Sequence, residues 1–255
     1  MTDLAVLAVG FGVIPLASIL LLSFRDWIAA HRPALWGAAA GIIAFLGLSH
    51  AMGFVLAGKP FLFGGESEAM TVLFLLTGLG LGGSLGWFVF EGPFPGPEPS
   101  RIVWAIAAFL ALHSFGDGLV LGRGFVGGVG PILQLDAVNV SATVVHRLVE
   151  GALLLVPTMA AGWRHRSSFL ILLLSLSSIP AAYLPGFFFD WRGLVDGSAT
   201  TQSVSIFLAS MEASLALAVL ARGFLAGLIT DRSSRWLPFV LIGFIAISVV
   251  HFLVE

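Results

Sequence analysis

The stretch AVNVSATVVHRLVEGALLLVPTMAA, residues 137–161, is apolar over most of its length and yet contains three ionisable side chains, His146, Arg147 and Glu150. A helix that crosses a bilayer needs about 20 mainly apolar residues, so this stretch is long enough to cross. Ionisable side chains inside such a segment are costly and mark functional sites by default. We therefore expect a membrane-spanning helix with a functional group near its middle.

The composition of the whole chain agrees with a membrane protein. Of the 255 residues, 58% are hydrophobic and only 10% are charged, and the mean hydropathy is +1.03. Ordinary soluble domains are about 25% charged, so a cytosolic enzyme is excluded. The net charge of -2 provides no basic surface for a phosphate backbone, and nucleic acid is not an expected partner. The absence of cysteine excludes disulfides, thiolate catalysis, iron–sulfur clusters and Cys-type zinc sites.

Apolar runs between charged or Pro/Gly-rich breaks predict an all-α fold. We expect a single transmembrane domain, residues 1–255, that is a polytopic helical bundle in the lipid bilayer. Backbone groups in lipid must be satisfied internally, and the runs are too long for the strands of a barrel. The Pro-rich segment 91–100 reads as a stiff linker inside this domain. The eight expected transmembrane helices are roughly 4–24, 34–57, 69–90, 102–126, 137–161, 168–189, 198–221 and 236–254.

The distribution of Lys and Arg predicts the orientation, because these residues are enriched in cytoplasmic loops. With the N-terminus outside, eight of the twelve fall in cytoplasmic loops, three fall in outer loops, and Arg147 lies within a span. We expect an integral protein of the plasma (inner) membrane with both termini outside. Asp3 stands where a signal peptide would carry a positive residue, so the first run is read as a span.

A second polar group in the preceding span repeats the pattern of the first. Residues 113–118 read HSFGDG and residues 146–151 read HRLVEG, so each has a His, a carboxylate four residues later, and then Gly. Residues four apart share a helix face, and consecutive spans are expected to be antiparallel neighbours. His113, Asp117, His146 and Glu150 would then converge as a ligand set for a divalent metal such as zinc. The simpler alternative is that each His–carboxylate pair only ties helices together.

These two motifs resemble those of the ZIP (Zrt/Irt-like) family of metal transporters. HSFGDGLVLG resembles the family's fourth helix, which reads HNxxDG or HNxPEG, and HRLVEGALL resembles its fifth, which reads HExxHE or QNxPEG. The resemblance implies eight spans in a 3+2+3 arrangement, with the first and last three related as inverted repeats. It also implies that His113, Asp117, His146 and Glu150 form the primary metal site.

The family's second metal position is altered in this chain. Ser114 and Arg147 stand where the family has Asn or Glu, and Ile179-Pro180 is the best match to its Glu-Pro pair. The chain is therefore expected to be a divergent member with one metal ion, and a non-transporting metal-binding homologue stays open as an alternative.

We expect roles within the membrane for three further polar positions. Arg147 is expected to pair with the carboxylates in the place of a second metal, the alternative being that it snorkels to the surface. Glu212 is read as a ligand on the metal path, as the partner of Arg147, or as a simple helix–helix hydrogen bond. His50 is a candidate path residue or a packed core histidine.

The expected function is transport of divalent metal cations, zinc foremost, with iron and manganese also open. The metal is the substrate, no prosthetic group is expected, and the protein is not expected to be an enzyme. A homodimer stays open. The alternatives are an intramembrane zinc-dependent hydrolase, with Glu212 as its candidate general base, and a b-type haem protein that uses His113 and His146.

Overall fold

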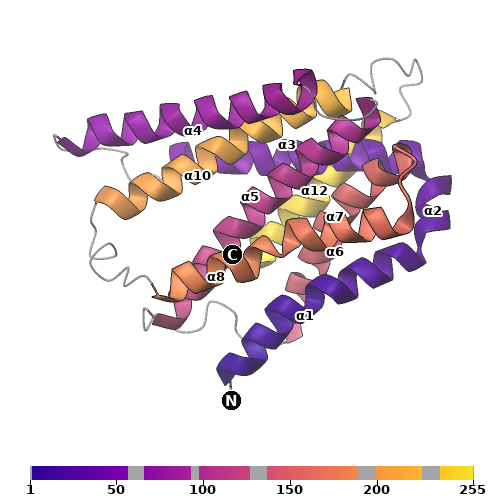
Figure 1. The fold of residues 1–255 in the computed structure, drawn as a ribbon, viewed down its shortest axis with the longest axis horizontal. Coiled ribbons are helices and arrows are strands. Elements are labelled where there is room, and N and C mark those ends of the chain that lie inside the picture. Colours follow the sequence, from indigo (N-terminus) through magenta and orange to yellow (C-terminus); the bar gives the residue numbers. More distant parts are fainter. Residues whose placement is uncertain are drawn as a thin grey trace.

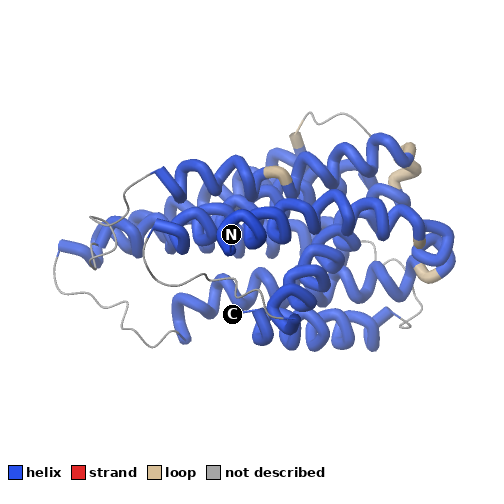
Figure 2. The backbone as a smooth tube through the Cα atoms, turned by 90° about the horizontal axis from the view of Figure 1, so that it is seen from below, coloured by secondary structure: helices blue, strands red, loops and turns tan. Residues whose placement is uncertain are grey.

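The computed structural model describes residues 2–56, 66–92, 98–126, 137–188, 199–225 and 236–254. Within these ranges every element is a helix, which confirms the all-α prediction for the described part of the chain (Figure 1). Figure 2 shows the same helices from below, and the loops that it colours tan are short. The helices are α1 Thr2–Ser23, α2 Arg25–Ala30, α3 Arg32–Leu56, α4 Glu66–Glu91, α5 Glu98–Val126, α6 Ala137–Ala160, α7 His165–Leu176, α8 Ser178–Phe188, α10 Ala199–Ala218, η1 Val219–Leu225 and α12 Leu237–Val254.

Each of the eight predicted ranges coincides with one helix or with two consecutive helical segments, but two of them differ in detail. The range 168–189 is broken at Ser177 into α7 and α8. Pro180, in the first turn of α8, has no N–H for the carbonyl of Leu176, so the hydrogen-bond ladder of the helix is interrupted there. The range 198–221 continues as the π-helical segment η1, which ends at Leu225.

Among the residues that the structure describes, four helical segments are long and apolar enough to cross a membrane, as in an integral membrane protein. Large apolar side chains stand exposed on outer faces, among them Leu76 of α4 at 59% and Leu241 of α12 at 61%. Such faces suit contact with lipid rather than with water. The four segments are Arg32–Ser49, Val72–Glu91, His165–Tyr183 and Ile206–Leu225, and shorter apolar segments are Gly12–Ser23, Ser100–Gly116 and Leu237–Val250.

The helix pairs follow a twofold pattern. α4 packs along α10, and α3 packs along α12; α5 packs on α8, and α6 packs on α1. The long α4–α10 pair is plain in Figure 1. In the centre, α5 contacts α6 and α3 contacts α10. Exchanging α1 with α7–α8, α3 with α10, α4 with α12 and α5 with α6 leaves this set of pairs unchanged.

Glycines allow the paired helices to approach closely. A Cβ at Gly41 of α3 would overlap the carbonyl oxygen of Val240 in α12, and one at Gly82 of α4 would overlap that of Met211 in α10. Small residues serve this purpose wherever helices cross at short distance in membranes. The two glycines that follow the predicted ligands also make close contacts, but with helices outside the α5–α6 pair. Gly118 lies against Ile179 of α8, and Gly151 lies against the side chain of Leu21 in α1.

The buried core centres on α5. Val103, Ile106, Phe109 and Leu110 of this helix have no exposed surface. One further turn along the same helix brings the chain to His113, which continues this buried face. The polar group of α5 is therefore held inside the bundle by the apolar residues that precede it.

Candidate metal centre

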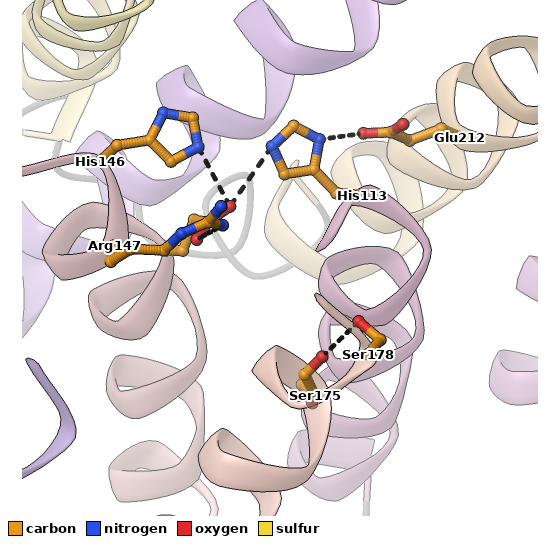
Figure 3. A network of polar contacts seen from close by, with 7 residues as sticks. His113, His146, Arg147, Ser175, Ser178 and Glu212 are labelled. Atoms are coloured by element: carbon orange, nitrogen blue, oxygen red, sulfur yellow. Dashed lines mark hydrogen bonds and ion pairs between the residues drawn. The ribbon is translucent and has the colours of Figure 1, made fainter. Parts of the chain in front are cut away.

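Among the described side chains, five ionisable ones from three helices meet inside the bundle. His113 comes from α5, His146, Arg147 and Glu150 come from α6, and Glu212 comes from α10. Their exposed fractions lie between 2% and 8%. Figure 3 shows the ring of His113 between His146 and Glu212, with Arg147 on the near side of the group. Charged groups buried to this extent must be paired with one another or with an ion.

Helix α6 presents its three polar side chains on one face. His146 Nε2 lies 3.2 Å from Glu150 Oε1, one helical turn away. Arg147 Nη1 donates to Glu150 Oε2 at 2.6 Å from the position three residues earlier. The two oxygens of the Glu150 carboxylate are therefore divided between an imidazole and a guanidinium of its own helix. This division follows from helical spacing alone.

Helix α5 adds a second imidazole to the same oxygen. His113 Nε2 lies 3.3 Å from Glu150 Oε1. The rings of His113 and His146 are stacked, with centroids 5.7 Å apart and planes 9° from parallel. One ligand atom each of His113, His146 and Glu150 can be chosen so that all three lie within 4.8 Å of one another. The two motifs read from the sequence thus share one buried cluster, which we call the His–Glu cluster.

Glu212 lies against the ring nitrogen of His113 that faces away from Glu150, and it influences which nitrogen carries the proton. His113 Nδ1 lies 2.7 Å from Glu212 Oε1. An ionised carboxylate can only accept, so Nδ1 carries the proton and donates it. In the neutral imidazole Nε2 then bears a lone pair that faces Glu150 Oε1 at 3.3 Å, and a metal cation between these two acceptors would be stabilised. A protonated imidazole would instead donate to both carboxylates.

Two further buried polar atoms lie within this region of the described structure without a hydrogen-bond partner. They are His146 Nδ1 and the Oγ of Ser114, the residue that follows His113. Ser114 has no exposed surface at all. Buried polar atoms in native proteins nearly always have a partner, commonly an ion or an ordered water. An ordered water can satisfy each of these atoms.

Three of the four predicted ligands come together in the structure, and the side chain of the fourth is not described. His113, His146 and Glu150 form the His–Glu cluster. Asp117 belongs to α5, but its side chain is not among the described ones, and neither is that of His50 in α3.

The structure decides between the alternatives for Arg147 and shows one partner of Glu212. Arg147 is buried and pairs with Glu150, so the alternative that it snorkels to the surface is wrong. Glu212 makes a helix–helix hydrogen bond with His113. No local sequence signal could reveal that this bond orients a predicted ligand.

Comparison of the chain with protein-family models gives no match, and comparison with curated proteins gives none either. Fold and site together define a helical membrane protein with a buried His–Glu cluster that could hold a metal ion. The functional argument therefore rests on the chemistry and geometry of these side chains.

Proposed function

We propose that this protein transports divalent metal cations, zinc foremost, across the membrane as a divergent relative of the ZIP (Zrt/Irt-like) transporters. The observation that carries the proposal is the His–Glu cluster itself. It offers three ligand atoms of mixed imidazole and carboxylate type, from two helices, at buried positions within 4.8 Å of one another. His113, His146 and Glu150 are the proposed ligands of the passing ion, with Asp117 as the fourth.

The distances between the ligand atoms support a small tetrahedral ion. Zinc bonds to His nitrogen and carboxylate oxygen are about 2.0–2.2 Å long, which places neighbouring ligand atoms about 3.3 Å apart. Glu150 Oε1 lies 3.2 Å from His146 Nε2 and 3.3 Å from His113 Nε2. Imidazole with carboxylate suits zinc, and also iron or manganese, whereas copper(I) prefers the sulfur ligands that this cluster lacks.

The charge of the region supports a divalent ion. By sequence Asp117, Glu150 and Glu212 contribute three negative charges, and Arg147 contributes one positive charge. Burial makes an uncompensated charge cost several kcal/mol. One divalent cation brings the sum to zero while both imidazoles stay neutral, which is the form in which they bind a metal.

The pairing of helices supports transport rather than storage. The proposed ligands lie on α5 and α6, which exchange with each other in the twofold pattern of helix pairs. Transporters built from inverted repeats hold their substrate at such a pseudo-twofold position and rock the surrounding helices past it. The proposal therefore includes eight spans in a 3+2+3 arrangement, with both termini outside.

One feature favours a zinc-dependent hydrolase as the second candidate. Two His and one Glu with an open position form a ligand set found in catalytic zinc sites. A hydrolase also needs a general base, for which Glu212 was the candidate. Because Glu212 accepts a hydrogen bond from His113 at 2.7 Å, it is engaged in holding a ligand, which counts against that use.

Metal uptake into vesicles that contain the purified protein tests the proposal. A zinc-sensitive dye inside the vesicles reports entry of the ion. We expect uptake by the wild type and by His165→Ala, which removes an exposed histidine, and loss of uptake in His113→Ala. Metal binding without uptake would identify a non-transporting homologue, and cleavage of a lipid or peptide without uptake would identify the hydrolase. Absence of metal binding by the wild type would overturn both.

A further inference from the structure

A groove lies between α4 and the α10–η1 segment. Its volume is about 660 Å³, within the range of sites that bind small ligands. Gly83, Gly86, Trp87 and Phe90 of α4 line it on one side, and Ala218 lines it on the other. None of these residues belongs to the His–Glu cluster, so the groove has no part in the function proposed above.

Small residues open the groove, and aromatic side chains line it. A Cβ placed on Gly86 would crowd that of Ala218, so the two helices lie close together at this level. A Cβ on Gly83 would meet nothing within 4 Å, so the space above this residue is open. Trp87 is 65% exposed and offers an apolar face along this opening. The lining matches an acyl chain rather than a polar solute.

One positive and one negative side chain lie at the end of the groove. Arg222 of η1 pairs with Glu91, the last residue of α4, and the two side chains are 63% and 42% exposed. They lie at or near the ends of the apolar segments Val72–Glu91 and Ile206–Leu225. The ends of spanning segments lie at the level of the lipid headgroups, where Trp and Arg are favoured.

The helix containing Arg222 is distorted at this point. η1, Val219–Leu225, is π-helical, whereas α10 before it is regular. π-Helical turns cost stability and occur often at functional sites. The wider turn includes Arg222 at the charged end of the groove and Gly223 against Phe90 and Ile102. The π-helical turn thus forms the charged end of the groove wall.

We propose that this groove binds one phospholipid whose headgroup carries both a phosphate and a primary amine. An acyl chain lies over Gly83 and along Trp87, the phosphate pairs with Arg222, and the ammonium group pairs with Glu91. Arg222 and Glu91 carry opposite charges that sum to zero, and such a pair complements a zwitterionic headgroup. An anionic headgroup without an amine would leave Glu91 without a partner and would repel it. The lipid replaces the ion pair between Glu91 and Arg222 with two pairs of its own.

Native mass spectrometry of the full-length protein in detergent, with added phosphatidylethanolamine, tests the apolar part of the site. We expect one retained lipid per chain. Gly83→Leu extends into the open space, because a Cβ at this position meets nothing within 4 Å, and retention should fall about tenfold. Gly80→Leu is the matched control, because Gly80 is equally open but does not line the groove. Equal retention by these two variants would overturn the proposal.

The headgroup is tested with the same measurement. Phosphatidylglycerol, which has the phosphate but no amine, should be retained about tenfold less than phosphatidylethanolamine. Glu91→Gln should remove this preference, and Arg222→Gln should weaken retention of both lipids. Equal retention of the two lipids by the wild type would show general contact with the bilayer instead of a site. Unchanged melting temperatures of all variants exclude misfolding as the cause of any loss.

Discussion

Glu212 accepts a hydrogen bond at 2.7 Å from Nδ1 of His113, a residue 99 positions earlier in the chain. A carboxylate bound to the far nitrogen of an imidazole fixes the tautomer and the ring orientation, and it raises the basicity of the nitrogen that binds metal. In this protein that nitrogen is Nε2, which faces Glu150. Helix α10 therefore acts on the proposed metal ligands through His113.

Removal of this carboxylate should weaken metal binding without removing a ligand. We expect Glu212→Ala to reduce zinc affinity by about 10- to 100-fold, because His113 loses the partner that orients its ring. Glu212→Gln keeps an acceptor oxygen but not the charge, so its effect should be smaller. Isothermal titration calorimetry measures both, and Glu91→Ala, at an exposed acid, is the control. Equal affinity of wild type and Glu212→Ala would contradict the role given to Glu212.

Arg147 should limit the number of bound ions to one. Its guanidinium donates to Glu150 Oε2 at 2.6 Å and so occupies one oxygen of a proposed ligand. A fixed positive charge beside the site opposes a cation, so Arg147→Ala should bind zinc at least about tenfold more tightly or bind a second ion. Calorimetry gives both stoichiometry and affinity, and Arg147→Lys should resemble the wild type. Two ions per wild-type chain would show that Arg147 does not exclude the second.

Glu150 should be required for metal binding and for stability by separate mechanisms. Glu150→Gln weakens a ligand, and we expect zinc affinity to fall at least about tenfold. It also leaves Arg147 buried beside a neutral group, and breaking a buried ion pair costs about 3–5 kcal/mol. The double variant Glu150→Gln with Arg147→Met should recover thermal stability, whereas its zinc affinity should stay at least about tenfold below that of Arg147→Met alone. Equal zinc affinity of these two variants would mean that Glu150 is structural only.

Gly118 should be required for the packing of α8 on α5. A Cβ there would overlap the carbonyl oxygen of Ile179, so backbone must move. We expect Gly118→Ala to destabilise the fold by about 1–3 kcal/mol, as overpacking does. Gly116→Ala on the same helix meets nothing within 4 Å, and it should be neutral or slightly stabilising because Ala favours helix. Thermal unfolding in detergent compares them, and equal melting temperatures would contradict the observed packing.

Cysteine labelling should reveal the orientation directly, because the native chain contains no cysteine. With the N-terminus outside, Asp3→Cys should react with a membrane-impermeant reagent on intact cells. Arg166→Cys, at an exposed position near the start of α7, should react only after permeabilisation. The opposite result would place the basic loops outside, against the enrichment of Lys and Arg in cytoplasmic loops.

The helical class, the approximate helix ranges and the two polar motifs could be predicted from the order of the residues. Long apolar runs have one solution in lipid, since each backbone group must be satisfied within its own helix. Spacing also determined that His146, Arg147 and Glu150 would meet, because residues three and four apart share a helix face. The break at Ser177 was missed because Pro180 within an apolar run ends a helix in some settings and only bends it in others.

The contacts of the polar groups with residues of other helices could not be predicted in this way. The contacts of His113 with Glu150 and Glu212 depend on how α5, α6 and α10 are packed. That packing follows from close contacts at glycines such as Gly82 and Gly118, whose partners lie far away in the chain. A periodic pattern specifies which face of a helix is polar but not which neighbour that face meets. The role of Glu212 and the groove beside Gly83 could therefore be found only after the helices were assembled.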